Sequence, residues 1–287
     1  MALTTKQLVL AAGSAVDFQM HTTLSDGRWQ PDELIGHLAR EKFGLAAITD
    51  HERPDTYQEI QRLAEKHHMP ILPAAEMTTS WKGWTDVLCF GFRPGDTPLA
   101  RLAEEVRARQ SDYTRECYED LKKKGVALPD DLAELNAIVA LPSTAQPYAL
   151  ADLAIKSGFQ TKSSSWWRVS QEMGYKLADS DIAAVVEAGH QSGAICLVAH
   201  PGRGGDNPVL DAAGLDEVRA YAPLDGFEAY YPLHKPEQVE MYLDYAKRHG
   251  LVVSAGSDSH SPEKPPIRYR AEQVRALLER VGVRVSA

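Results

Sequence analysis

Short apolar runs alternate with amphipathic segments along roughly the first third of the chain. After Pro31, three apolar residues at helical spacing and a closing glycine predict a helix. A second helix is predicted at about Thr56–His67 on the same spacing. Four apolar runs around these helices are predicted strands: Ala15–Met20, Leu45–Thr49, Met69–Ala74 and the returning run Asp86–Phe92. This alternation is typical of βα units around a mostly parallel sheet.

The same alternation returns near the end of the chain, whereas the middle differs. Late strands are predicted at Ala194–Ala199, Gly226–Tyr230 and Leu251–Ala255, before a last helix that carries Leu277 and Leu278. Between them the pattern is mainly helical or loop-like, and it includes a helix after Ser180. We therefore predict an α/β barrel in two parts, residues 1–98 and 194–287, interrupted by a helical cap insertion at residues 99–193.

Composition narrows the class of protein. The 287 residues are 44% hydrophobic and 25% charged, as in an ordinary globular protein. A net charge of -9 argues against bulk nucleic-acid binding, so an anionic substrate must be met locally. Cys89, Cys117 and Cys196 lie far apart, so we expect a reducing cytoplasm and neither a disulfide framework nor a thiolate zinc site. We find no signal-peptide core or membrane-length apolar run, and expect a cytoplasmic protein without a membrane partner.

Candidate metal ligands follow the carboxyl ends of nearly all the predicted strands. Barrel enzymes place their active sites at this end. Imidazoles and carboxylates are the usual ligands of zinc, manganese and iron, and a carboxylate such as Glu76 can bridge two ions. One buried His or Asp at a strand end is more often a structural group, but several at successive strand ends indicate a metal site. These residues are His21, Asp26, His51, Glu76, His200, Asp258 and His260.

Six segments of the chain together resemble the PHP family, named for polymerase and histidinol phosphatase domains. They run in family order through both halves of the sequence: Asp17–Gly27, Ile48–His51, Ala75–Glu76, Ala199–Arg203, Gly226–Tyr231 and Gly256–His260. The resemblance implies a distorted (β/α)7 TIM-like barrel that holds up to three divalent ions, Mn, Zn, Fe or Mg. The insertion is similar to the cap of the branch that acts on AMP-like and 3',5'-bisphosphonucleotide substrates.

The resemblance also implies how the ligands are shared among the ions. One ion would be held by His21, Glu76 and Asp258. A second would be held by Glu76 and His200. The third would be held by Asp26, His51 and His260.

Three places depart from the family pattern. The family begins with His-x-His, but Gln19 takes the first histidine's place, and an amide oxygen favours harder ions such as manganese or magnesium. Leu88 stands where a second family histidine is usual; Asp86, on the same strand face, either replaces that ligand or is a solvated residue beside a turn. In the insertion, Gln146-Pro147-Tyr148 replaces an Arg-Pro-His that is thought to grip phosphate.

For an enzyme of this kind, metal ions would activate a water molecule that attacks phosphorus in line. His200 or His234 would protonate the leaving oxygen, and the fork of Arg203 would clamp a phosphoryl oxygen. Lys162 and Arg168 are either phosphate contacts or exposed surface charges. The candidate substrate-binding residues are therefore Arg203, Tyr231, His234, Lys162 and Arg168.

The sequence favours a metal-dependent phosphoesterase that hydrolyses a small phosphate monoester, such as a nucleotide. Two alternatives stay open. One is an exonuclease of the same family, which the acidic net charge makes less favoured. The other is a metal-poor binding protein with lost or altered catalysis, which the three motif departures suggest.

Overall fold

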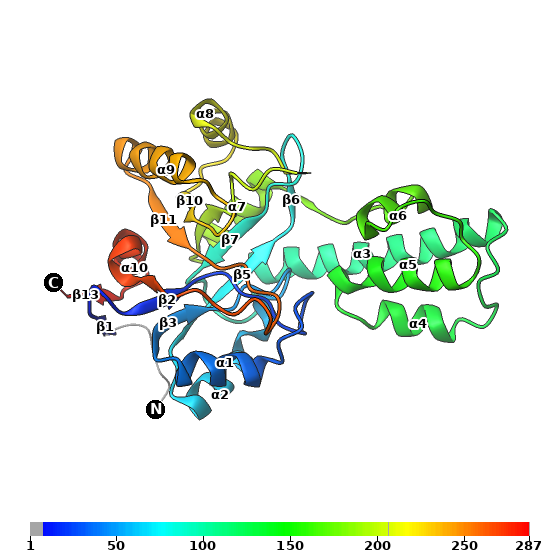
Figure 1. Ribbon diagram of the computed structural model, residues 1–287, viewed down its shortest axis with the longest axis horizontal. Coiled ribbons are helices and arrows are strands. Elements are labelled where there is room, and N and C mark those ends of the chain that lie inside the picture. Colours follow the sequence, from blue (N-terminus) through cyan, green and yellow to red (C-terminus); the bar gives the residue numbers. More distant parts are fainter. Residues whose placement is uncertain (1–7, 206, 287) are drawn as a thin grey trace. The chain divides into compact units, whose positions relative to one another are not determined.

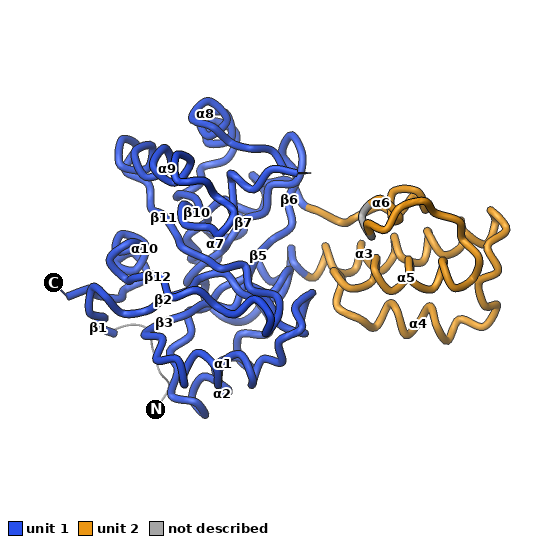
Figure 2. The backbone as a smooth tube through the Cα atoms, viewed as in Figure 1, with its two compact units in different colours: residues 1–103, 180–287 blue, residues 104–179 orange. Residues whose placement is uncertain are grey.

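The computed structural model describes residues 8–205 and 207–286, which form two compact units (Figures 1 and 2). Unit 1 comprises residues 1–103 and 180–287, and unit 2 comprises residues 104–179. Helix α3 (Pro98–Lys123) begins in unit 1 and continues in unit 2. Among the described residues, none of the helices combines the length and the apolar character that crossing a membrane requires.

Two sheets form the frame of unit 1. The larger has the order β11 (Val252–Ala255), β10 (Gly226–Tyr230), β9 (Ile195–Val198), β7 (Val87–Phe90), β5 (Ala74–Met77). The smaller has the order β12 (Tyr269–Arg270), β2 (Ala15–Asp17), β3 (Phe43–Ala47), β4 (Ile71–Leu72). Strand β7 is antiparallel to both of its neighbours, and β12 is antiparallel to β2, whereas the other pairs in these sheets are parallel.

Short strand pairs complete the unit. Strand β1 (Val9–Leu10) pairs with β13 (Arg284–Val285), and β6 (Thr79–Ser80) pairs with β8 (Ser180–Asp181). The pairing of β1 with β13 brings the two ends of the described chain together, so the frame is held at its termini.

The facing sides of the two main sheets share one apolar core. Val16 and Phe18 from the smaller sheet belong to the same buried cluster as Phe90 and Leu197 from the larger one. Phe18 and Phe90 meet edge to face with ring centroids 6.1 Å apart. Because side chains alternate along a strand, the other face of each sheet is left for helices.

Helices cover the outer faces of the sheets (Figure 1). On the smaller sheet lie α1 (Pro31–Arg40) and α2 (Tyr57–His67), the second preceded by a 3-10 turn at Pro54–Thr56. On the larger sheet lie α7 (Ile182–Gln191), α8 (Ala212–Tyr221) and α9 (Pro236–His249). A 3-10 turn at Ala271–Val274 and helix α10 (Arg275–Arg280) pack against the shared core.

Isolated backbone contacts link the two sheets at their carboxyl ends. The amide of Phe18 donates to the carbonyl of Ala255 at 2.9 Å, and the amide of Glu76 donates to the carbonyl of Thr49 at 3.1 Å. The strands are therefore arranged as a mixed α/β fold in two sheets, with single contacts rather than paired strands between them.

Unit 2 is helical and has a core of its own. Besides α3 it contains α4 (Ala133–Val139), a 3-10 turn at Ser143–Ala145, α5 (Gln146–Lys156) and α6 (Trp166–Met173). Tyr118, Leu121, Leu150 and Ala154 are buried together in its centre.

Most predicted elements occur within a few residues of their predicted bounds, but two findings differ from the sequence pattern. Helices α8 and α9 were not predicted, and the Ala-Ala-Gly start of α8 gives only a weak amphipathic pattern. Helix α7, which follows Ser180 as predicted, belongs to unit 1, where Ile182 and Val185 are buried against the larger sheet.

Candidate metal centre

The candidate ligands gather at one edge of unit 1, where the parallel strands end. Glu76 lies within β5, and its backbone forms an isolated bridge with that of His51. Because β7 runs antiparallel to β5, its first residues lie at this same edge, and the residue just before it is Asp86. The remaining strands β2, β3, β9 and β11 are followed by His21, His51, His200 and Asp258.

His21 lies at the centre of the cluster and is fully buried. Its Nε2 atom is 3.1 Å from Glu76 Oε2 and 3.3 Å from Asp258 Oδ1. Its Nδ1 atom is 3.5 Å from Asp26 Oδ1. Its ring stacks on that of His260, with centroids 4.1 Å apart.

Glu76 divides its two carboxylate oxygens between neighbouring groups. Oε2 faces His21, while Oε1 lies 3.3 Å from Nε2 of His200. A carboxylate oxygen of Asp86 joins the latter pair, and the three ligand atoms lie within 4.8 Å of one another. We call His21, Glu76, Asp86, His200 and Asp258 the inner group.

A second group of ligands lies closer to solvent. Asp26 Oδ1 is 3.4 Å from His260 Nε2, and Asp26 Oδ2 is 3.9 Å from His51 Nε2. The side chain of His260 is 35% exposed, whereas that of Glu76 is 1% exposed. We call Asp26, His51 and His260 the outer group.

Neighbouring oxygens contact the Nδ1 atoms of both imidazoles in the outer group. His260 Nδ1 lies 2.9 Å from the backbone carbonyl of Asp258, to which it donates. His51 Nδ1 lies 3.4 Å from the hydroxyl oxygen of Thr78. Both contacts hold Nδ1 and direct Nε2 toward Asp26, which is the orientation of a metal-binding histidine with a supporting oxygen.

Several buried polar atoms in this cluster lack a hydrogen-bond partner among the described residues. Both ring nitrogens of His21 are of this kind, although carboxylate oxygens lie nearby. Glu76 Oε1, Asp86 Oδ1 and Gln19 Oε1 are also unpartnered. Buried polar atoms without partners are costly, and a cation on which they converge would satisfy them. The donor atoms therefore fit divalent metal ions.

Burial and neighbouring charges both shift the pKa values of the ionisable groups. Burial lowers the pKa of His51, but the carboxylates of Glu76 and Asp26 outweigh it and raise that pKa to about 9. Burial, together with the negative charge of Glu76, raises the pKa of Asp86 to about 6. Burial also raises the pKa of Asp26, but the neighbouring His51 and His260 hold it well below its usual range. Without metal, these acids are thus compensated by imidazolium groups, whose protons a bound cation would displace.

Asp50 holds the loop that carries His21 and Asp26. Its carboxylate accepts hydrogen bonds from the amide and the hydroxyl of Thr22 and from the hydroxyl of Ser25, each at 2.7 Å. Asp50 lies in the segment Ile48–His51, and no role was predicted for it from the sequence. An aspartate directly before a candidate ligand was the signal that could have revealed it.

The backbone is unusual at two strand ends. His200 has a φ of 29° and Asp258 a φ of 52°. Positive φ is rare for residues other than glycine and costs about 1–3 kcal/mol where the surrounding structure imposes it. Both residues are candidate ligands, so the unusual backbone directs their side chains into the cluster.

The predicted substrate contacts differ in position. Arg203 is partly exposed, and its Nη1 atom lies 3.7 Å from Asp258 Oδ2. The hydroxyl of Tyr231 donates to the same oxygen at 3.2 Å. His234, in contrast, accepts from the amide of Gly202 through Nε2 at 3.0 Å and contacts the carbonyl of Ala229 through Nδ1 at 3.0 Å. Both ring nitrogens of His234 therefore contact backbone groups. These contacts differ from the catalytic or substrate contact that was predicted for His234.

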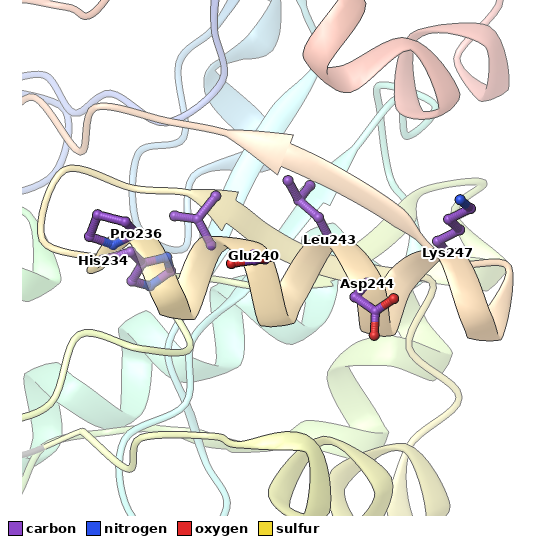
Figure 3. Close-up of a pocket in the computed structure, with 7 residues that line it drawn as sticks. His234, Pro236, Glu240, Leu243, Asp244 and Lys247 are labelled. Atoms are coloured by element: carbon purple, nitrogen blue, oxygen red, sulfur yellow. The ribbon is translucent and has the colours of Figure 1, made fainter.

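A shallow groove begins at His234 and follows α9 outward (Figure 3). Its other lining residues include the apolar Leu243 and the charged Glu240, Asp244 and Lys247, spread along the helix. These groups are distributed along the groove and do not converge on a point, in contrast to the inner and outer groups.

Two further candidates lie in unit 2. Lys162 and Arg168 are both exposed. Their predicted contact with phosphate stays a prediction.

Another cluster lies at the opposite ends of the strands. His190, Cys196 and Asp225 bring ligand atoms together, but the Asp225 carboxylate contacts His190 at 2.8 Å and accepts from the guanidinium of Arg280 at 2.6 Å. It also accepts from the amide of Cys196 at 2.8 Å. These contacts satisfy Asp225, so we interpret the cluster as structural.

Comparison with known proteins shows what this chain is similar to. No model of a known protein family matches the chain. A 3',5'-nucleoside bisphosphate phosphatase of Chromobacterium violaceum is 24% identical over 268 residues, covering 86% of this chain and 87% of that protein. A 5'-3' exoribonuclease of Haemophilus influenzae is 23% identical over 249 residues, covering 86% and 90%.

Solved structures agree on the fold. A structure described as a metal-dependent phosphoesterase from Bifidobacterium adolescentis matches with a TM-score of 0.74 and 24% identity, covering 93% of this chain and 96% of that chain. A two-domain protein from Bacteroides vulgatus with a PHP-like metal-dependent phosphoesterase matches with a TM-score of 0.50 and 14% identity, covering 96% and 66%. These similarities agree with the resemblance of the sequence to the PHP family.

Two departures from the PHP pattern lie in unit 1. The side-chain amide of Gln19 donates to Glu76 Oε2 at 3.0 Å and supplies no ring nitrogen. Leu88 faces the apolar core shared by the sheets. Asp86, two positions earlier, brings its carboxylate to Glu76 and His200 and is partly buried. Its role as a metal ligand stays a prediction.

The third departure from the PHP pattern has a structural explanation in unit 2. Gln146 is buried, accepts from the hydroxyl of Thr114 at 2.7 Å, and donates to the carbonyls of Val139 and Leu141, each at 3.2 Å. Position 146 is thus turned into the core of unit 2 and ties three helices and a turn together.

Proposed function

We propose that this chain is a metal-dependent phosphoesterase that hydrolyses a small phosphate monoester, such as a nucleotide. The observation that carries the proposal is the convergence of buried imidazole and carboxylate atoms without hydrogen-bond partners, as at His21 and Glu76, in the part of the chain that the structure describes. The names of the curated relatives, a nucleoside bisphosphate phosphatase and an exoribonuclease, support phosphate-ester chemistry.

In this proposal the site holds one to three divalent ions of Mn, Zn, Fe or Mg. The inner group would take one or two of them, because Glu76 presents one oxygen to His21 and the other to His200. The outer group would take another. When bound, such ions supply positive charge to the phosphoryl oxygens and lower the pKa of a water molecule toward neutrality.

Arg203 would bind the phosphoryl group. It follows β9 in the same loop as His200, and Asp258 draws its guanidinium toward the cluster. A guanidinium fork suits two oxygens of a phosphate. Tyr231, through its bond to Asp258, keeps that carboxylate oriented instead of contacting substrate itself.

The proton for the leaving oxygen would come from solvent. Nε2 of His200 faces Glu76, where it serves as a ligand, and both nitrogens of His234 are bound to backbone. Neither imidazole is therefore available as the general acid that the sequence suggested.

The architecture in this proposal is a distorted (β/α)7 barrel. Strands β2, β3, β4 with β5, β7, β9, β10 and β11 would form the ring, and the backbone contacts of Phe18 with Ala255 and of Glu76 with Thr49 support its closure. Unit 2 would be the inserted helical subdomain of that barrel. The cytoplasmic location stays a prediction.

The test is phosphate release by purified protein supplied with manganese. The panel contains AMP, adenosine 3',5'-bisphosphate and a short oligoribonucleotide. We expect release from a small monoester, and loss of that release in both His51→Ala and Asp258→Ala. Fewer than about one bound ion per chain, with no release from any member of the panel, would overturn the proposal and leave the metal-poor binding protein.

An exoribonuclease is the second candidate, because three curated relatives carry that name. The same panel separates the two functions. Mononucleotides released stepwise from the oligoribonucleotide, with AMP and the bisphosphate untouched, would favour the exoribonuclease.

A further inference from the structure

We infer that the metal centre is divided between two classes of ion, with a zinc-like ion in the outer group and a harder ion, such as manganese or magnesium, in the inner group. The inference rests on the proposed function, since it names the occupants of the same site. It is carried by the different ligand atoms that the two groups offer.

The outer group is rich in nitrogen. Two imidazole Nε2 atoms, from His51 and His260, face a single carboxylate, Asp26. Both imidazoles have their Nδ1 atoms on supporting oxygens, so Nε2 of each is the atom that would bind a metal ion. Two nitrogens and one carboxylate, with an open position toward solvent, match the ligand chemistry of zinc.

The inner group is rich in oxygen. Its two imidazoles, His21 and His200, share the carboxylate of Glu76. A second carboxylate of the group lies beside each imidazole, Asp258 beside His21 and Asp86 beside His200. Each half thus offers one nitrogen to two carboxylates. Oxygen-rich sites favour manganese and magnesium over softer ions.

Two side chains account for the low nitrogen content of the inner group. Gln19 points its amide nitrogen at Glu76 Oε2, at 3.0 Å, so it adds no imidazole to the half that contains His21. Asp86 supplies a carboxylate to the half that contains His200. Asp86 is therefore the residue that we assign as the determinant of metal preference in that half.

Zinc binds more tightly than manganese at most sites of nitrogen and oxygen ligands. The preference must therefore be measured as a difference between the two groups when zinc is limiting. The two groups also differ in exposure, which helps to distinguish them. The side chain of His260 in the outer group is 35% exposed and that of Glu76 in the inner group is 1% exposed, so ions should exchange faster at the outer group.

The experiment loads metal-free protein with one equivalent of zinc and an excess of manganese, removes free metal by gel filtration, and measures both elements and the manganese EPR signal. Wild-type protein should retain both metals. His260→Ala should lose zinc about tenfold or more and keep manganese, whereas Asp86→Asn should lose manganese and keep zinc. With two equivalents of zinc, Asp86→His should take up the second zinc in place of manganese.

Matched controls come from outside the site. His190→Ala and Asp244→Asn remove an imidazole and a carboxylate elsewhere in unit 1, and neither should change the metal content. Far-UV circular dichroism and melting curves establish that each variant is folded. If His260→Ala does not fold, His51→Ala removes a ligand of the same group and should likewise lose zinc and keep manganese.

The outcomes separate the inference from the proposed function. If His260→Ala and Asp86→Asn lose the two metals in the same proportion, the division is overturned, and phosphate release by the wild type leaves the proposed function in place. If the wild type binds neither metal, both are overturned.

Discussion

Two buried polar clusters, one in each unit, differ in whether their polar atoms are hydrogen-bonded. In unit 2, Gln146 makes hydrogen bonds through both of its amide atoms, and Gln110 does the same. In unit 1, the ring nitrogens of His21 and one oxygen of Glu76 lie close to other polar atoms and form no hydrogen bond among the described residues. The cluster in unit 2 consists of neutral amide and hydroxyl groups that are paired, whereas the cluster in unit 1 consists of imidazoles and carboxylates with unpartnered atoms.

The difference teaches how to separate a structural cluster from a binding site. A network whose members satisfy one another stabilises the fold and needs nothing further. A cluster whose atoms converge without satisfying one another is stable only because the surrounding fold imposes it, and it gains when a ligand arrives. The four predictions below test this contrast.

The largest effect is expected for Glu76→Gln. The amide cannot provide two anionic oxygens, so both halves of the inner group lose a ligand. Phosphate release should fall on the order of a thousandfold, about 4 kcal/mol of transition-state stabilisation. The measurement is phosphate release with metal content on the same sample. Glu187→Gln on the surface is the control, and unchanged activity in Glu76→Gln would place the chemistry elsewhere.

Metal should stabilise the protein by a smaller amount. An ion at about a hundred times its Kd stabilises a fold by about 2.7 kcal/mol, provided that it binds the folded form only. Melting by calorimetry with manganese and after removal of metal by a chelator should show this as an increase in Tm. Asp258→Ala, which removes a ligand from the inner group, should show little increase; an increase equal to that of the wild type would contradict the site.

In unit 2, Gln146→Ala should act on stability alone. The change leaves the hydroxyl of Thr114 and the carbonyls of Val139 and Leu141 without the partner they have now, at a cost of about 2 kcal/mol in the free energy of unfolding. Denaturant unfolding measures the loss, and metal content should not change. Gln160→Ala, at an exposed position, should cost less than about 0.5 kcal/mol. Lost metal binding in Gln146→Ala would break the contrast between the clusters.

The smallest expected effect is a difference of one proton in the number released when metal binds. Because the pKa of His51 is raised to about 9, the metal-free protein still carries this proton at pH 8, and metal must displace it. Affinity at the outer group should therefore rise with pH until about pH 9, by up to about tenfold, or 1.4 kcal/mol, per pH unit. Metal titration in weak buffer at pH 8 should release about one proton fewer from His51→Ala than from the wild type. His190→Ala should release as many as the wild type, and equal release from His51→Ala would refute the assignment.

The places of the main strands along the chain and the residues just after them could be predicted from the sequence. The periodic run Gly226–Tyr230 is a strand with those same bounds, and the helix predicted to begin at Pro31 does so. His21 and His51 are brought together because apolar periodicity gives the strands, and parallel strands end at a common edge.

Other features depend on pairing between distant segments and could not be predicted. The role of Asp86 follows from the antiparallel register of β7 with β5, in which Val87 pairs with Met77. One chain segment alone does not reveal which neighbour it will pair with. In the same way, Gln146 is held inward by Thr114, a residue of another helix, and local sequence contains no sign of that contact.

The left-handed backbone at His200 and Asp258 has a consequence for how this chain can change over time. Glycine would relieve the strain at either position, but it would remove the side chain that reaches the cluster. Stability and activity thus select for different residues at these two strand ends, so improving one reduces the other. A lineage that no longer needed the chemistry would be free to accept glycine there, and retention of histidine and aspartate in a descendant would indicate that the site is still in use.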